Sequence, residues 1–120
     1  MSYQLQMEQM PGYLVARFIG AGVAEEIWPQ FDSIAEHCKQ TKNNKVLIDV
    51  TRAEAKFSLL DRYLGGESAR IFAVYDIKVA GVDTPERIDP EKFGVLVARN
   101  RGVNVDMFTD FQAAEKWLLK

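Results

Sequence analysis

The fold is decided by residues 46–58, which read VLIDVTRAEAKFS. The first five residues form a short apolar run of the kind found in a central strand that is buried on both faces of a sheet. We expect a loop over Thr51–Phe57, and Ser58 then opens a helix that extends to about Ala73. A strand that leads through a loop into a helix is the repeating unit of a parallel α/β sheet.

Upstream of this unit the sequence predicts a hairpin. Apolar and polar residues alternate over Tyr3–Met10, a Pro-Gly turn follows, and Tyr13–Ile19 is rich in strand-forming residues. Residues 24–39 have apolar side chains at helical spacing, which predicts a helix between the hairpin and the central strand.

Downstream of the unit, strands and helices alternate. We expect strands at Ile77–Val82 and Asn104–Phe108, a helix around Glu91–Arg101, and a final helix that is capped by Thr109-Asp110, with Gln112 three residues after Thr109 as in a capping box. The predicted fold is therefore α/β: a mixed five-stranded sheet, with an N-terminal antiparallel hairpin and the remaining strands parallel, packed with four helices.

Composition and charge exclude several classes of protein. The chain has 120 residues, 48% of them hydrophobic and 27% charged, which suits one globular domain over residues 1–120. The net charge of -2 argues against nonspecific nucleic-acid binding, which depends on a basic surface. No apolar run approaches the roughly 20 residues of a membrane span. The first residues lack the apolar core of a signal peptide, so we expect a cytoplasmic protein.

No set of general acid, base and nucleophile converges in the sequence, and we expect neither enzymatic activity nor a cofactor. Cys38 lies on the apolar face of its helix, which favours a core residue over a nucleophile, and the adjacent His37 does not face it. Asp49, Asp83 and Asp110 follow strands at one edge of the sheet and could hold a hard cation. Capping and turn formation explain the same residues without a metal.

Two helices have features that favour a ligand pocket. The helix over residues 91–101 is apolar on more of its surface than one buried stripe needs, which indicates a fully buried helix or a mobile lid over an apolar pocket. In the preceding helix, Gly65 and Gly66 each lower helix propensity by about 1 kcal/mol relative to alanine and predict a break or hinge. Arg99 and Arg101 are candidate contacts for a lipid headgroup. The candidate ligand-binding residues are Phe57, Leu60, Leu64, Phe72, Phe93, Leu96 and Val97.

Three stretches together resemble the SpoIIAA-like family, which is related to STAS domains and to the CRAL-TRIO lipid-binding fold. They are the opening stretch over residues 46–58, IKVAGVD at 77–83, and VNVDMFTDFQAAEKWL at 103–118. The resemblance covers essentially the whole chain and carries no catalytic motif. It implies a SpoIIAA/STAS-like fold, and its CRAL-TRIO side implies an apolar cavity between the sheet and helices that move.

The resemblance also suggests a role for Ser58. STAS-type anti-sigma-factor antagonists carry a phosphorylated serine in an Asp-Ser-Ser-Gly motif at the start of the helix after the third strand. The matching stretch here is Phe57-Ser58-Leu59-Leu60, which keeps one serine and lacks the aspartate, the second serine and the glycine. Ser58 is thus a predicted N-cap, with Asp61 three residues on, and a candidate phosphoacceptor.

Three functional hypotheses follow. The first is a non-enzymatic module that binds a small apolar or lipid-like ligand between the sheet and the second and third helices, with peripheral association at the inner membrane face. The alternative is a protein-interaction regulator that resembles the anti-sigma-factor antagonists and is switched at Ser58. The third, a metal-dependent enzyme at Asp49 and Asp83, requires a bound cation, and we assign no metal ligand.

Overall fold

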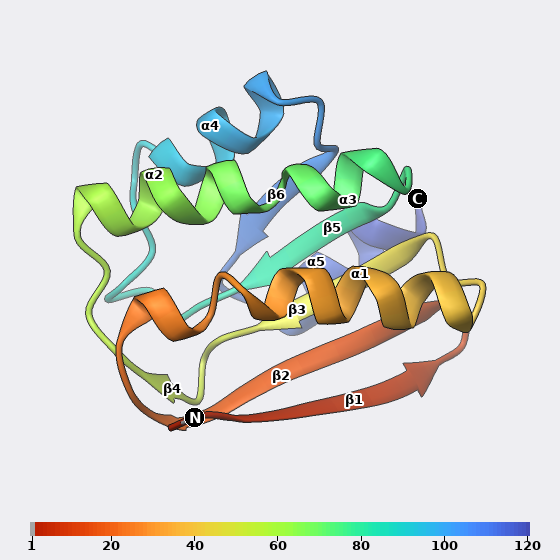
Figure 1. The fold of residues 1–120 in the computed structure, drawn as a ribbon, viewed down its shortest axis with the longest axis horizontal. Coiled ribbons are helices and arrows are strands. Elements are labelled where there is room, and N and C mark those ends of the chain that lie inside the picture. The colour runs from red at the N-terminus through yellow and green to blue at the C-terminus, as the bar shows by residue number, and fades with distance from the viewer. Residues whose placement is uncertain (1) are drawn as a thin grey trace.

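The computed structural model describes residues 2–120 and shows one mixed sheet with helices on both of its faces (Figure 1). The strands are β1 (Gln4–Met10), β2 (Tyr13–Ala21), β3 (Lys45–Asp49), β4 (Ala53–Glu54), β5 (Lys78–Val82) and β6 (Val105–Phe108). The helices are a 3-10 turn η1 (Ala24–Glu26), α1 (Gln30–Gln40), α2 (Leu59–Ser68), α3 (Arg70–Val74), α4 (Phe93–Asn100) and α5 (Phe111–Leu119).

The order of strands confirms the predicted topology. The sheet runs β1-β2-β3-β5-β6; β1 is antiparallel to β2, and each later neighbour is parallel. The sheet has one strand more than the five that we expected. The additional strand is β4, which was expected to be part of a loop. It has only two residues and pairs with the end of β2, where Ala53 lies beside Gly20. A strand this short has no periodicity, so hydrophobic patterning does not reveal it.

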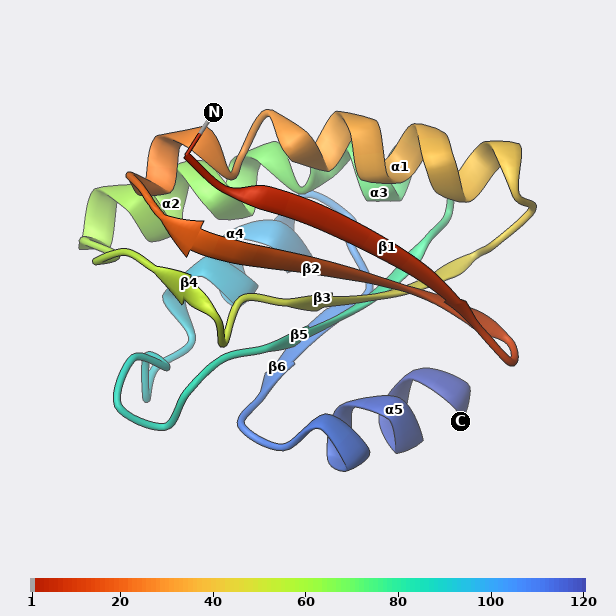
Figure 2. The same cartoon turned by 90° about the horizontal axis from the view of Figure 1, so that it is seen from below.

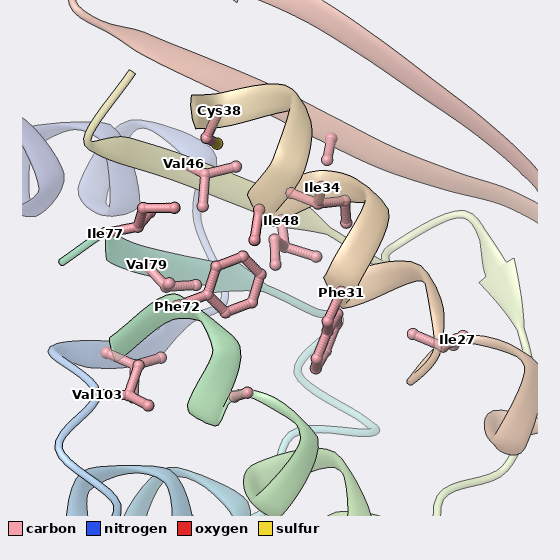
Figure 3. Close-up of a cluster of buried hydrophobic side chains, with 14 of the residues drawn as sticks. Ile27, Phe31, Ile34, Cys38, Val46, Ile48, Phe72, Ile77, Val79 and Val103 are labelled. Carbon is pink, nitrogen blue, oxygen red and sulfur yellow. The ribbon is translucent and has the colours of Figure 1, made fainter. Parts of the chain in front are cut away.

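The core has two layers, one on each face of the sheet. Figure 2 shows α1, α2, α3 and α4 on one face and α5 alone on the other. On the first face, Phe31 of α1 and Phe72 of α3 pack with ring centroids 5.5 Å apart above Ile48 of β3 (Figure 3). On the second face, Ala114 and Leu118 of α5 are fully buried. Burial of each large apolar side chain contributes about 1.5–3 kcal/mol to folding.

The expected single helix over residues 58–73 is divided at Ala69, between α2 and α3. The break that we expected at Gly65 and Gly66 lies at Ala69 instead, and both glycines are buried within α2. They serve close packing instead. A Cβ atom on Gly66 would lie 2.5 Å from the carbonyl oxygen of Gly94 in α4, and one on Gly65 would lie 2.8 Å from the ring of Trp28.

Pro29 and Asp110 mark the starts of two other helices. Residues 24–39 do not form one helix: η1 ends at Glu26 and α1 begins at Gln30, directly after Pro29, because proline inside a continuous helix would lack the N–H donor that the helix needs. Of the two residues expected to cap the final helix, Thr109 and Asp110, the N-cap is Asp110. The Asp110 carboxylate accepts a hydrogen bond from the backbone N–H of Ala113 at 3.1 Å.

Candidate functional site

A cavity of about 160 Å³ lies between the sheet and the helices α2 and α4. Its wall is largely apolar and includes the rings of Trp28, Phe31, Phe57 and Phe72. Phe57 and Phe72 are thus the two candidate ligand residues that line it. The cavity lies in the place that the resemblance implied, between the sheet and the two helices.

The other five candidate ligand residues lie outside the lining of the cavity. Leu60 and Leu96 are 64% and 51% exposed to solvent. Leu64 and Phe93 are half-buried, and Val97 is buried against α2. The broad apolar surface of α4 has two separate causes: one side packs on α2 and the sheet, while Leu96 faces solvent.

Arg99 and Arg101, the candidate headgroup contacts, are ion-paired within the chain. The Arg101 guanidinium lies 3.3 Å from the Glu67 carboxylate, and that of Arg99 lies 3.6 Å from Asp106. Lys92 also pairs with Asp106 at 2.8 Å. Burial opposes the ionisation of Asp106, but the two cations and a hydrogen bond from the Met107 backbone N–H together outweigh it and hold the pKa of Asp106 below its usual range. No described helix is long and apolar enough to cross a membrane.

The aspartates at the strand ends have structural partners. Asp49 accepts hydrogen bonds from the backbone N–H and the hydroxyl of Thr51 at 2.9 and 2.7 Å. Over residues 2–120, no group of three or more metal-ligating side chains converges. Cys38 is fully buried, and burial raises the pKa of its thiol to about 11, as befits a core residue.

Arg87, in the loop between β5 and α4, is the best-connected polar side chain near the cavity. Its Nε donates to both carboxylate oxygens of Asp83 at 2.9 and 3.0 Å, and Asp83 is 2% exposed. The two terminal nitrogens donate to the backbone carbonyls of Val50, Ala53 and Ala55. One guanidinium therefore ties the loop after β5 to the segment that leads into α2.

The same segment ends at Phe57, whose ring has cationic and aromatic neighbours. The Arg87 guanidinium lies 4.9 Å from the Phe57 ring centroid and that of Arg62 lies 5.9 Å away. The Trp28 ring packs on it at 5.9 Å. Sequence analysis missed Arg87, because an arginine in a polar loop has no local signal that distinguishes it from a solvated residue.

Ser58, directly after Phe57, is exposed and caps α2 as predicted. Its hydroxyl accepts a hydrogen bond from the Asp61 backbone N–H at 3.1 Å, and the Asp61 carboxylate accepts one from the Ser58 N–H at 2.8 Å. These two bonds form a reciprocal capping box. The next two residues, Leu59 and Leu60, are 67% and 64% exposed.

No family model matches the chain, and no curated protein matches it in sequence. Solved structures do match in fold. An anti-sigma factor antagonist from Mycobacterium paratuberculosis superposes with a TM-score of 0.62 and 11% identity, covering 99% of this chain and 96% of that one. A protein from Shewanella loihica described as having a SpoIIAA-like fold gives 0.57 and 18%, covering 98% and 94%. The chain has a SpoIIAA-like fold.

A third match extends this finding. SpoIIAA, a cell fate determinant of Bacillus seen in its phosphorylated form, superposes with a TM-score of 0.51 and 14% identity, covering 95% of this chain and 99% of that one. The matches correct our first functional hypothesis. The proteins that share the fold are described as an anti-sigma factor antagonist and a cell fate determinant, and neither description concerns a lipid or a membrane. The expectation of a small apolar or lipid-like ligand was wrong.

Proposed function

We propose that this chain is a non-enzymatic, single-domain protein-interaction regulator that binds its partner through the start of α2. The observation that carries the proposal is the exposure of two adjacent leucines, Leu59 and Leu60, directly after an exposed serine cap. Exposed apolar groups that gather at one place on a surface favour contact with another protein. The likeness in fold to an anti-sigma factor antagonist supports the same reading.

The start of α2 is also held in a fixed conformation before any partner arrives. Arg87 holds the backbone carbonyls of Ala53 and Ala55, and the Phe57 ring is packed against Trp28. The capping box then fixes the first turn of the helix. A surface ordered in advance loses less conformational entropy on binding, which favours affinity.

A matched pair of substitutions tests the proposed surface. Leu59→Glu places a charge at the start of α2, and Val74→Glu places the same charge on α3 at an equally exposed residue, since both side chains are 67% exposed. We expect the proteins captured by the wild-type chain from its native cell extract to be lost with Leu59→Glu and retained with Val74→Glu, because a buried charge disfavours an apolar interface. Quantitative mass spectrometry measures the difference, and equal capture by both variants would contradict the proposal.

A second pair tests whether Ser58 is a switch. Asparagine and aspartate are both good N-caps, so Ser58→Asn and Ser58→Asp keep the helix start while only the second adds a charge. With a partner identified as above, we expect Ser58→Asp to weaken binding by about tenfold or more and Ser58→Asn to leave it nearly unchanged, because the new charge must be desolvated beside Leu59. Titration calorimetry measures both affinities. Equal affinities would remove Ser58 as a charge-controlled switch.

A further inference from the structure

Five lysines gather at the end of the molecule opposite to Ser58. Figure 2 shows that α1 and α5 end where β3 and β5 begin, at the far end of the sheet from the start of α2. We call this surface the basic end. Its lysines are Lys39, Lys42, Lys45, Lys78 and Lys120, and the exposed Asp76 just before β5 forms an ion pair with none of them.

None of these lysines has a carboxylate partner among the described residues. The ion pairs of residues 2–120 involve Arg17, Arg87, Lys92, Arg99 and Arg101, all of which lie outside the basic end. Lys39, Lys42 and Lys120 are exposed, and Lys45 and Lys78 are half-buried. The positive charge of this surface is therefore not neutralised by ion pairs within the chain.

The arrangement brings like charges together. Lys45 and Lys78 lie directly beside each other on neighbouring strands, where like charges are destabilising. Burial, together with the charges of Lys45 and Lys120, lowers the pKa of Lys78. The Lys78 ammonium lies 4.4 Å from the Trp117 ring centroid and donates to the Trp117 carbonyl at 2.8 Å, which fixes it in place. The repulsion between Lys45 and Lys78 is a local cost to stability, and costs of this kind are expected at functional surfaces.

We propose that the basic end binds an acidic segment of a protein partner. This surface is separate from the start of α2 and goes beyond the function proposed above. Charge complementarity indicates the partner: a cluster of ammonium groups without internal counter-ions attracts carboxylates and raises the rate of encounter. The basic end contains no arginine, the residue best suited to bidentate phosphate binding, which favours carboxylates over the phosphates of nucleic acid.

A fluorescently labelled polyglutamate peptide is the probe that tests this proposal. The first variant, Lys42→Glu/Lys45→Glu, reverses two charges of the basic end. The control, Arg52→Glu/Lys56→Glu, makes the same change in net charge near Ser58, at two exposed residues. Circular dichroism first establishes that both variants fold, and fluorescence anisotropy then measures peptide binding at low and at physiological ionic strength.

We expect the wild-type chain to bind the peptide, with an affinity that falls as salt rises. The Lys42→Glu/Lys45→Glu variant should bind at least about tenfold more weakly, and the control should stay within about twofold of wild type. Equal weakening in both variants would show an effect of net charge and overturn the proposal. Tighter binding of phosphatidylglycerol vesicles or of a single-stranded oligonucleotide, or no binding of polyglutamate, would also overturn it. None of these results depends on whether a partner binds at Leu59.

Discussion

Gly66→Ala is expected to lower the free energy of unfolding by about 3 kcal/mol, although alanine is the better helix former by about 1 kcal/mol. The new Cβ would lie 2.5 Å from the Gly94 carbonyl oxygen and 2.8 Å from Cβ of Val97. The first of these atoms belongs to the backbone of α4 and cannot rotate away. Helices α2 and α4 would have to separate, which exposes apolar surface around the cavity between them. Urea unfolding followed by circular dichroism measures the change.

Two neighbouring substitutions separate steric conflict from helix propensity. Gly65→Ala meets the ring of Trp28 at 2.8 Å, and because a side chain can move, we expect a smaller loss of about 1 kcal/mol. Ser68→Ala, at the end of the same helix, should change stability by less than about 0.5 kcal/mol. If Gly66→Ala were as stable as Ser68→Ala, the close approach of α2 and α4 would be incorrect.

The contrast between these glycines and the strands shows what a sequence can predict here. Burial on a sheet imposes a local pattern, so the runs at Tyr3–Met10 and Val46–Val50 placed their strands to within about one residue. A glycine in a helix has two opposite physical meanings: local flexibility or close contact with another element. Only the position of α4 decides between them, and the local sequence around Gly66 carries no information about where α4 packs.

The residues of the candidate site also differ in whether the local sequence predicts them. Ser58 was predicted as an N-cap because its partner Asp61 is three residues away, and the structure confirms both bonds of the capping box. Arg87 could not be predicted, since its carbonyl partners Val50, Ala53 and Ala55 lie more than thirty residues earlier in the chain. The wide apolar surface of α4 was interpreted as that of a fully buried helix or of a mobile lid over a pocket. Its Leu96 proved to be exposed.

Arg87→Met should have the largest effect of any substitution of a charged residue that we consider, with a loss of about 3–5 kcal/mol in the free energy of unfolding. Methionine keeps much of the side-chain volume but leaves the Asp83 carboxylate, whose side chain is 3% exposed, as a buried charge without its partner. Three backbone carbonyls also lose the hydrogen bonds that the guanidinium donates to them. Arg101→Met is the control. The side chains of its ion pair with Glu67 are 28% and 50% exposed, so water screens the pair and a loss below about 1 kcal/mol is expected.

The companion variants identify the cause. Adding Asp83→Asn to Arg87→Met removes the unpaired buried charge and should recover about 1–2 kcal/mol of the free energy of unfolding. Asp83→Asn by itself should destabilise the wild-type chain. Arg87→Lys retains the charge but has too few directed donors for a carboxylate and three carbonyls, so an intermediate loss is expected. Because the carbonyls of Ala53 and Ala55 belong to the segment that leads into Ser58, amide hydrogen exchange over residues 52–60 should increase in Arg87→Met more than in Arg101→Met. Equal exchange in these two variants would mean that Arg87 stabilises the sheet edge without ordering the proposed partner surface.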